Sequence, residues 1–141
     1  MPTFGPTSSR RLATCHLDLQ AICAEAIQLV DFAVLCGSRP KADQDVAVAT
    51  GTSRAPWPSS AHNVDGVKRR TSWAVDLAPY PIDWQDVGRF VALRSHMEAV
   101  AGRLLAEGKI RHGLKPLLYL GRGRTKPDRP HFELAGVADG E

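Results

Sequence analysis

The sequence predicts an α+β fold, a small antiparallel sheet with packed helices, in a single domain over residues 1–141. Two segments carry helical stripes of apolar residues, and short apolar runs typical of strands lie between and after them. The chain contains no internal repeat, and its content of 43% hydrophobic and 23% charged residues is ordinary for a globular protein. Together these observations favour one core in which helices cover a sheet.

The N-terminal region is expected to supply a leader and the first helix. Residues 1–14 form a polar leader. In residues 18–30, apolar side chains recur at helical spacing, which predicts a helix with one core-facing stripe. The stripe comprises Leu19, Ile22, Cys23, Ala26, Ile27 and Val30.

A buried strand and a second, short helix are predicted next. Residues 32–36 form an apolar run rich in strand formers, and Gly37 stops this run. Residues 37–40 predict a turn. Residues 41–50 then favour a short helix that ends at Gly51, where a left-handed cap is commonly needed.

A long loop is predicted over residues 51–72, which contain Gly, Ser, Pro, Asn and Asp without periodicity. Loops of this length are uncommon inside small domains unless they have a function. A strand over residues 73–77 follows, and its alternation puts Asp76 on the face opposite Val75 and Leu77.

The C-terminal half predicts one long helix and several short strands. The helix covers residues 83–107, with Asp83 as its N-cap and Gly108 as its stop. Its expected buried stripe comprises Val87, Phe90, Val91, Val100, Ala101, Leu104 and Leu105. Short antiparallel strands are expected over residues 109–111, 117–120 and 131–134, and a flexible tail over residues 135–141.

Cysteine usage and hydropathy indicate a reducing compartment. Cys15, Cys23 and Cys36 are odd in number and lack C-x-x-C spacing, which favours free, buried thiols. No apolar run follows the N-terminal charges, and no stretch is long enough to cross a bilayer, so neither a signal peptide nor membrane insertion is expected. We therefore expect the protein to be made and kept in a cytoplasm.

The formal net charge of +3 is distributed unevenly. Residues 109–129 carry seven cations and a single acid, Asp128; the cations are Lys109, Arg111, Lys115, Arg122, Arg124, Lys126 and Arg129. Such a stretch would attract a polyanion or an acidic substrate. Charge runs are more often solvated loops, and both interpretations remain open at this point.

Three residues could together hold a zinc ion. His62 lies in the long loop, Asp76 in the strand that follows it, and His131 at the start of the last strand. Two imidazoles and one carboxylate leave zinc an open position for water, as catalytic sites require. Isolated histidines are more often surface or core residues, and His112 could replace either proposed histidine. His16 and His96 are expected to be structural.

Two further residues could act beside such a metal. Asp128 precedes His131 by three residues and could accept a proton from a metal-bound water as general base, or it could cap a turn. Arg39 follows a strand end and could face a developing oxyanion or a substrate carboxylate, or it could pair with a surface acid.

Several separated motifs occur in the same order as in a known protein family. They lie at residues 8–20, 31–39 with Gln44 downstream, 60–63, 73–84 and 128–134. The chain resembles the D-alanyl-D-alanine carboxypeptidase and L-alanyl-D-glutamate endopeptidase group of zinc peptidases, in particular its bacteriophage endolysins. This resemblance implies a Zn²⁺ cofactor and assigns each role to a position in this sequence. The implied zinc ligands are His62, Asp76 and His131, the catalytic residues Asp128 and Arg39, and the substrate-binding positions Ser60 and Gln44.

The resemblance also implies a reaction and a setting. The reaction is hydrolysis of a peptide bond in peptidoglycan stem peptides by a phage lysis enzyme. The enzyme would accumulate in the cytoplasm of the infected host until a membrane lesion admits it to the wall. We expect a monomer that binds stem peptides and no nucleic acid. The alternatives are a D-alanyl-D-alanine carboxypeptidase and a non-catalytic module that binds cell wall or nucleic acid.

Two features depart from the family pattern. Thirteen residues separate His62 from Asp76, where many relatives have a short connection. Residues 110–116 replace a segment that is usually rich in tryptophan and glycine and that helps to wall the cleft. The second departure predicts an altered substrate preference.

Overall fold

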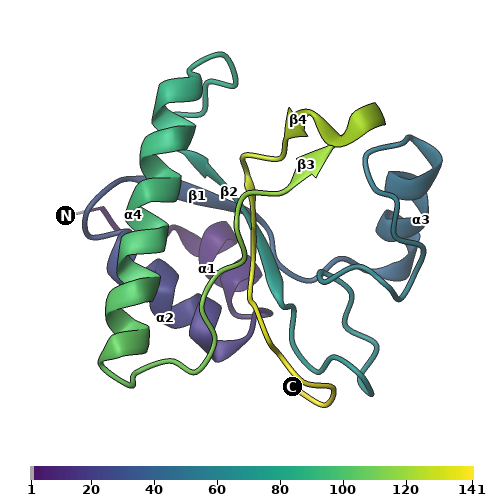
Figure 1. Ribbon diagram of the computed structural model, residues 1–141, viewed down its shortest axis with the longest axis horizontal. Helices are drawn as coiled ribbons and strands as arrows, with labels where there is room; N and C mark the ends of the chain where they lie inside the picture. The colour runs from purple at the N-terminus through teal and green to yellow at the C-terminus, as the bar shows by residue number, and fades with distance from the viewer. Residues whose placement is uncertain (1) are drawn as a thin grey trace.

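The computed structural model describes residues 2–141 and confirms the α+β fold. Its strands form a three-stranded antiparallel sheet, in the order β1-β2-β5, and a separate hairpin of β3 and β4 (Figure 1). The helices are α1 (Pro6–Leu12), α2 (Leu17–Ala26), α3 (Lys41–Ala49), α4 (Val87–Ala106) and the short 3₁₀ helix η1 (Arg122–Arg124). The strands are β1 (Phe32–Cys36), β2 (Ala74–Pro79), β3 (Tyr119–Leu120), β4 (Lys126–Pro127) and β5 (His131–Glu133).

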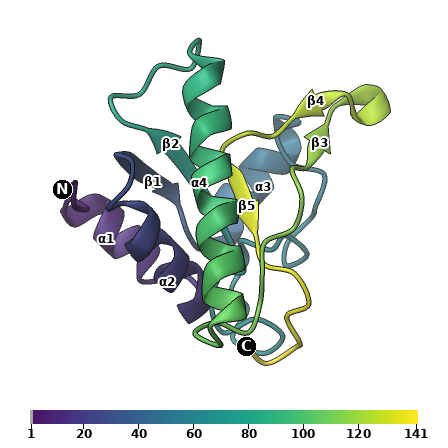
Figure 2. The same cartoon turned by 60° about the vertical axis from the view of Figure 1, so that its left-hand side comes forward.

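The two faces of the main sheet have different roles. Val75 and Phe132 are cross-strand partners on one face, where both are buried in the core. Helices α1, α2 and α4 gather on this side, while α3 and the β3–β4 hairpin lie beyond the sheet (Figures 1 and 2). Asp76 and His131 are the next pair in the register, so they project from the opposite face. The core helices thus leave one sheet face free to carry polar groups.

The long helix α4 differs from the prediction at its start and in its buried face. Asp86 is its N-cap and accepts a hydrogen bond from the backbone N–H of Arg89 at 3.4 Å, whereas Asp83 caps the preceding turn. Gly108 ends the helix with φ +70°, as expected. The buried side chains are Phe90, Leu93, Arg94, Met97, Val100, Ala101 and Leu104. The predicted stripe was wrong at Val87, Val91 and Leu105, which are exposed because they flank this face.

The predicted leader and tail are both structured. Within the leader, α1 lies against β1, where Arg11 donates to the carbonyl of Val34 at 3.0 Å and Ser8 accepts from its amide. Residues 135–141 were predicted as a flexible tail, but they fold back on the long loop. The amide of Gly140 donates to the carbonyl of Lys68, and the carbonyl of Glu141 accepts from the amide of Arg70. Hydrogen bonds from side chains of the leader therefore hold it against β1, and backbone hydrogen bonds hold the tail against the long loop.

The remaining boundaries shift by small amounts. Strand β1 has its predicted bounds, α3 lies within its predicted range, and Gly51 has the expected positive φ of +81°. Helix α2 ends at Ala26, four residues early. Residues 109–111 are not a strand, because Asp18 accepts from the amides of Arg111 and His112. Among the described residues, no helix is long and apolar enough to span a membrane.

Candidate functional site

Three side chains converge on the open face of the main sheet. The register of β2 with β5 places Asp76 opposite His131, and the long loop brings His62 against them. Nε2 of His62, Oδ1 of Asp76 and Nδ1 of His131 lie 3.2 Å from one another in all three pairs. The structure therefore brings the three predicted metal ligands together as a triangle of potential donor atoms.

In both histidines, the ring nitrogen that points away from the triangle lies within hydrogen-bond distance of an acceptor oxygen. Nδ1 of His62 lies 2.7 Å from the carbonyl oxygen of Gly37, which can only accept a hydrogen bond. Nε2 of His131 lies 3.0 Å from a carboxylate oxygen of Glu133. These partners assign the proton of each neutral ring to its outer nitrogen, so the nitrogens that face Asp76 carry lone pairs. Three electron-pair donors then face one another, and only a cation or a proton relieves their repulsion.

The titration behaviour of the site agrees with a strong preference for positive charge. Burial disfavours protonated His62, but hydrogen bonds with Asp76 and Cys36 outweigh that cost and raise its pKa to about 10. Burial alone would raise the pKa of Asp76, yet hydrogen bonds from His131 and His62 hold it far below its usual range. The pKa of His131 is likewise raised, against the effect of burial, by Asp76 and Glu133. A metal ion would take the place of the proton that this field attracts.

The donor set fits zinc in both chemistry and spacing. Zinc accepts histidine nitrogen and carboxylate oxygen with bonds of about 2.0–2.1 Å, and a tetrahedral ion with such bonds separates its ligand atoms by about 3.3–3.4 Å. The observed separations of 3.2 Å match one face of that tetrahedron. Three protein ligands leave the fourth position open, which is typical of catalytic sites.

Cys36 was predicted to be a buried free thiol, but it is only partly buried and lies beside the triangle, whereas Cys15 and Cys23 are buried as predicted. Cys36, His62 and Asp76 also have potential donor atoms within 4.8 Å of one another. Sγ of Cys36 lies 3.9 Å from Nδ1 of His62. This is the ring nitrogen that faces the Gly37 carbonyl. That nitrogen points away from the shared triangle, so we favour His131 over Cys36 as the third ligand.

Gly37 supplies the carbonyl that orients His62, and its position excludes a larger residue. A Cβ atom at Gly37 would lie 2.3 Å from the carbonyl oxygen of Arg11 and 2.4 Å from Oγ1 of Thr14. Ser72 also donates to the Gly37 carbonyl, at 3.2 Å. Close packing of the turn against α1 therefore fixes the acceptor for His62.

Arg39 and Gln44 belong to one buried hydrogen-bond network beside the triangle. A guanidinium nitrogen of Arg39 lies 3.6 Å from Oδ2 of Asp76, the carboxylate oxygen outside the triangle. The guanidinium also donates to the side-chain carbonyl of Gln44 at 3.0 Å. Gln44 was predicted to bind substrate, but it is fully buried and its amide group bonds Ser53, Ala55 and Asn63. Gln44 thus holds Arg39 in place and has no surface for a substrate.

Asp128 and Ser60 both lie near the triangle. Asp128 lies in the turn before β5, where burial raises the pKa of its carboxyl and the charges of His131 and Asp76 reach it. Ser60 accepts a hydrogen bond from the amide of His62 at 3.2 Å and therefore fixes the loop at that residue. A half-buried carboxyl of raised pKa beside a candidate metal is suited to accept a proton.

His112, the competing histidine, belongs to a different cluster. His112 and His16 both bind the carboxylate of Glu141 through Nε2, at 3.1 Å each. Nδ1 of His16 accepts from the amide of Asp18, so the proton of its neutral ring is on Nε2. That nitrogen then has no lone pair for a metal. This cluster is a set of hydrogen bonds that ties Glu141 to α2.

Glu133, Asn63 and Arg94 support the site although none of them was predicted as a site residue. Glu133 orients His131, Asn63 links Ser60 to Gln44, and Arg94 donates to the carbonyl of His131. Of these three residues, only Glu133 could have been predicted from the sequence to lie beside His131, because residues i and i+2 of a strand share a face. Asn63 and Arg94 act through contacts that depend on the tertiary fold.

Comparisons with known proteins identify relatives of this chain. A family model described as phage L-alanyl-D-glutamate peptidase matches residues 2–135. An L-alanyl-D-glutamate peptidase of Escherichia phage T5 is 35% identical over 106 residues, which cover 72% of this chain and 73% of that protein. The crystal structure of the Serratia marcescens L-Ala D-Glu endopeptidase ChiX is similar, with a TM-score of 0.69 and 25% identity. The match covers 93% of this chain and 88% of that one.

Proposed function

The chain belongs to the phage L-alanyl-D-glutamate peptidase family, and we propose that it is a zinc-dependent endopeptidase that cleaves stem peptides of peptidoglycan during phage lysis. The observation that carries this proposal is the triangle of His62, Asp76 and His131, whose donor atoms are 3.2 Å apart. Zinc, when bound there, supplies a Lewis acid and a water of lowered pKa. The bond to be cut is the one named in the relatives, between L-alanine and D-glutamate.

Asp128 is the proposed general base. Its carboxyl is half-buried, and the raised pKa increases its affinity for the proton of an attacking water. The same carboxyl can then return that proton to the amine released from the peptide. Its place in the turn directly before β5 keeps it beside His131 while leaving it out of the ligand triangle.

Arg39 is the proposed stabiliser of negative charge. Its guanidinium is fixed by Gln44 and by Asp76, so it reaches the site already oriented. A preoriented cation stabilises charge that develops on a carbonyl oxygen without the cost of reorganisation during the reaction. Asp76 is also a proposed metal ligand. Because Arg39 contacts Asp76 directly, its guanidinium lies next to the proposed metal centre.

Digestion of purified peptidoglycan tests the proposal. We expect mass spectrometry to find new amino termini at D-glutamate, cleavage to stop after chelation, and zinc to restore it. Release of free D-alanine would instead identify a carboxypeptidase. Full cleavage by demonstrably metal-free protein would refute the zinc assignment, and absence of cleavage by the zinc-loaded protein would refute the endopeptidase.

The setting and partners of the enzyme are part of the same proposal. We place it in the cytoplasm of the infected host until the membrane is permeabilised, as a monomer without nucleic-acid partners. In the basic stretch of residues 109–129, Lys109, Arg111 and Lys115 pair with acidic side chains, which leaves less free charge for a polyanion. Fractionation of infected cells tests the location, and strong salt-dependent DNA binding would contradict the partner assignment.

A further inference from the structure

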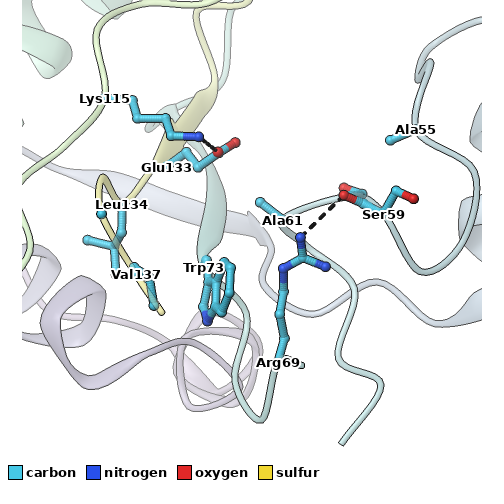
Figure 3. A pocket seen from close by; sticks show the side chains of 11 residues that line it. Ala55, Ser59, Ala61, Arg69, Trp73, Lys115, Glu133, Leu134 and Val137 are labelled. Atoms are coloured by element: carbon cyan, nitrogen blue, oxygen red, sulfur yellow. Dashed lines mark hydrogen bonds and ion pairs between the residues drawn. The ribbon is translucent and has the colours of Figure 1, made fainter. Parts of the chain in front are cut away.

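A pocket adjoins the candidate metal centre on the open face of the sheet. Its volume is about 380 Å³, and its walls come from the long loop, from β5 and from the segment before β3 (Figure 3). Two of its lining residues, Ser60 and Glu133, also bind the residues of the triangle. Glu133 follows His131 by two strand residues, which corresponds to about 7 Å. If a peptide bound with its scissile bond at the metal centre, the side chain of a residue next to that bond would therefore lie at this pocket.

Arg69 brings a buried positive charge to the pocket wall. Its side chain stacks over Trp73, and the residue is only 6% exposed. Two of its five N–H donors are satisfied by the carbonyls of Pro58 and Ser59, while Nε has no partner among residues 2–141. Asp65 binds the backbone amide of Arg69, and within the described chain no carboxylate lies within 4.0 Å of the guanidinium. Asp65 is thus near enough to interact with the charge of Arg69 but does not pair with its guanidinium, and a buried cation without a directly paired carboxylate favours the approach of an anion.

Lys115 adds a second cation on the opposite wall. It forms an ion pair with Glu133, whose other oxygen is occupied by His131. The ammonium has three donors, and its side chain is 44% exposed, so donors remain for a ligand. Two cations and one carboxylate leave the pocket with an excess of one positive charge.

We propose that this pocket binds the free carboxylate of the D-glutamyl residue next to the scissile bond, an assignment that rests on the proposed function. A glutamyl residue within a peptide uses one of its two carboxyl groups in the chain and keeps the other free. Lys115 binds that free carboxylate directly, and Arg69 contributes its charge from the opposite wall. Trp73, Leu134 and Val137 provide apolar contact for the methylene groups. The pocket thereby selects an ionised glutamyl residue over an amidated one.

Two synthetic stem peptides test this assignment. They contain the L-alanyl-D-glutamyl bond and differ only in whether the free carboxyl is a carboxylate or a carboxamide. We expect the zinc-loaded enzyme to have a KM at least about tenfold lower for the carboxylate peptide. Lys115→Gln should reduce this preference to about threefold or less, and Lys115→Arg should retain it because the charge is kept. The matched control Lys109→Gln removes an exposed lysine outside the pocket and should retain the full preference.

Equal KM values for the two peptides, or an unchanged preference in Lys115→Gln, would overturn the assignment. Binding of both peptides to the protein is measured in parallel by calorimetry. If neither peptide is cleaved, the proposed function fails, and the ratio of the two affinities still decides what the pocket binds. A ratio near one in that experiment would refute carboxylate recognition independently of catalysis.

Discussion

Replacement of Glu133 by alanine should weaken zinc binding although Glu133 is not itself a proposed ligand. Glu133 accepts from Nε2 of His131 at 3.0 Å, and this bond directs Nδ1 toward Asp76. Burial would raise the pKa of Glu133, but His131 and Lys115 outweigh it and lower that pKa to about 2. The group is therefore an ionised acceptor at neutral pH. Without it, Nε2 of His131 has no other hydrogen-bond partner among residues 2–141 to hold the ring and its proton in place.

The expected magnitude follows from the role of this bond. Loss of a partner that orients a metal-bound histidine typically costs about 10–100-fold in metal affinity, which corresponds to about 1.4–2.7 kcal/mol. Glu133→Gln keeps a carbonyl oxygen as acceptor but loses the charge, so its loss should be less than about tenfold. Neither variant removes an atom of the donor triangle. The site should therefore still bind zinc, with lower affinity.

Competition between the metal-free protein and a chromophoric chelator measures these affinities. Glu107→Ala is the matched control, because Glu107 also pairs with cations but lies at the end of α4, away from the site. Its zinc affinity should equal that of the wild type. A Glu133→Ala variant that binds zinc within twofold of the wild type would refute the orienting role, as would equal losses for the alanine and glutamine variants.

Three further predictions follow from the site and from the hydrogen bonds at the end of the chain. Asp128→Ala should retain zinc but lose at least about 100-fold in kcat, whereas His131→Ala should lose both; full activity of Asp128→Ala would exclude it as the base. Gly37→Ala should lower the thermal unfolding midpoint by several degrees, because its Cβ would overlap the carbonyl of Arg11; an unchanged midpoint would contradict that packing. Hydrogen bonds from histidine lower the pKa of Glu141 from 4.5 to about 2, so its stabilising effect is complete above pH 4.5 and is lost as the pH falls toward 2. Urea unfolding should accordingly find the wild type more stable than Glu141→Gln at pH 7, with a difference that shrinks between pH 4.5 and 2; a constant difference would refute the linkage.

Much of the local structure was predictable because it depends on short-range patterns. The apolar run of β1, the left-handed cap at Gly51 and the outward position of Asp76 each follow from neighbouring residues alone. The N-cap of α4 was missed because Asp83 and Asp86 both satisfy the local rule. The tertiary fold decides between them, since Phe90 and Met97 must face the core.

The contacts that organise the site depend on residues far apart in the chain. The carbonyl of Gly37 orients a histidine 25 positions later, and Gln44 fixes Arg39 through an amide that no periodic pattern distinguishes. The tail, residues 135–141, was expected to be flexible. Its backbone groups nevertheless pair with the long loop, and Glu141 accepts from His16 across 125 residues. Composition does not encode such pairings.

The choice between His112 and His131 illustrates how the sheet register creates the site. His131 is paired with Asp76, and the next pair, Phe132 with Val75, is buried on the other face. A slip of one residue in β5 would exchange the two faces, moving His131 into the core and Phe132 into the site. Burial of Phe132 opposes that slip, and Arg94, which stacks on Phe132 and binds the His131 carbonyl, opposes it further. The apolar contacts that stabilise the fold therefore also fix the position of the proposed third ligand, whereas His112 lies on a segment whose amide is bound by Asp18.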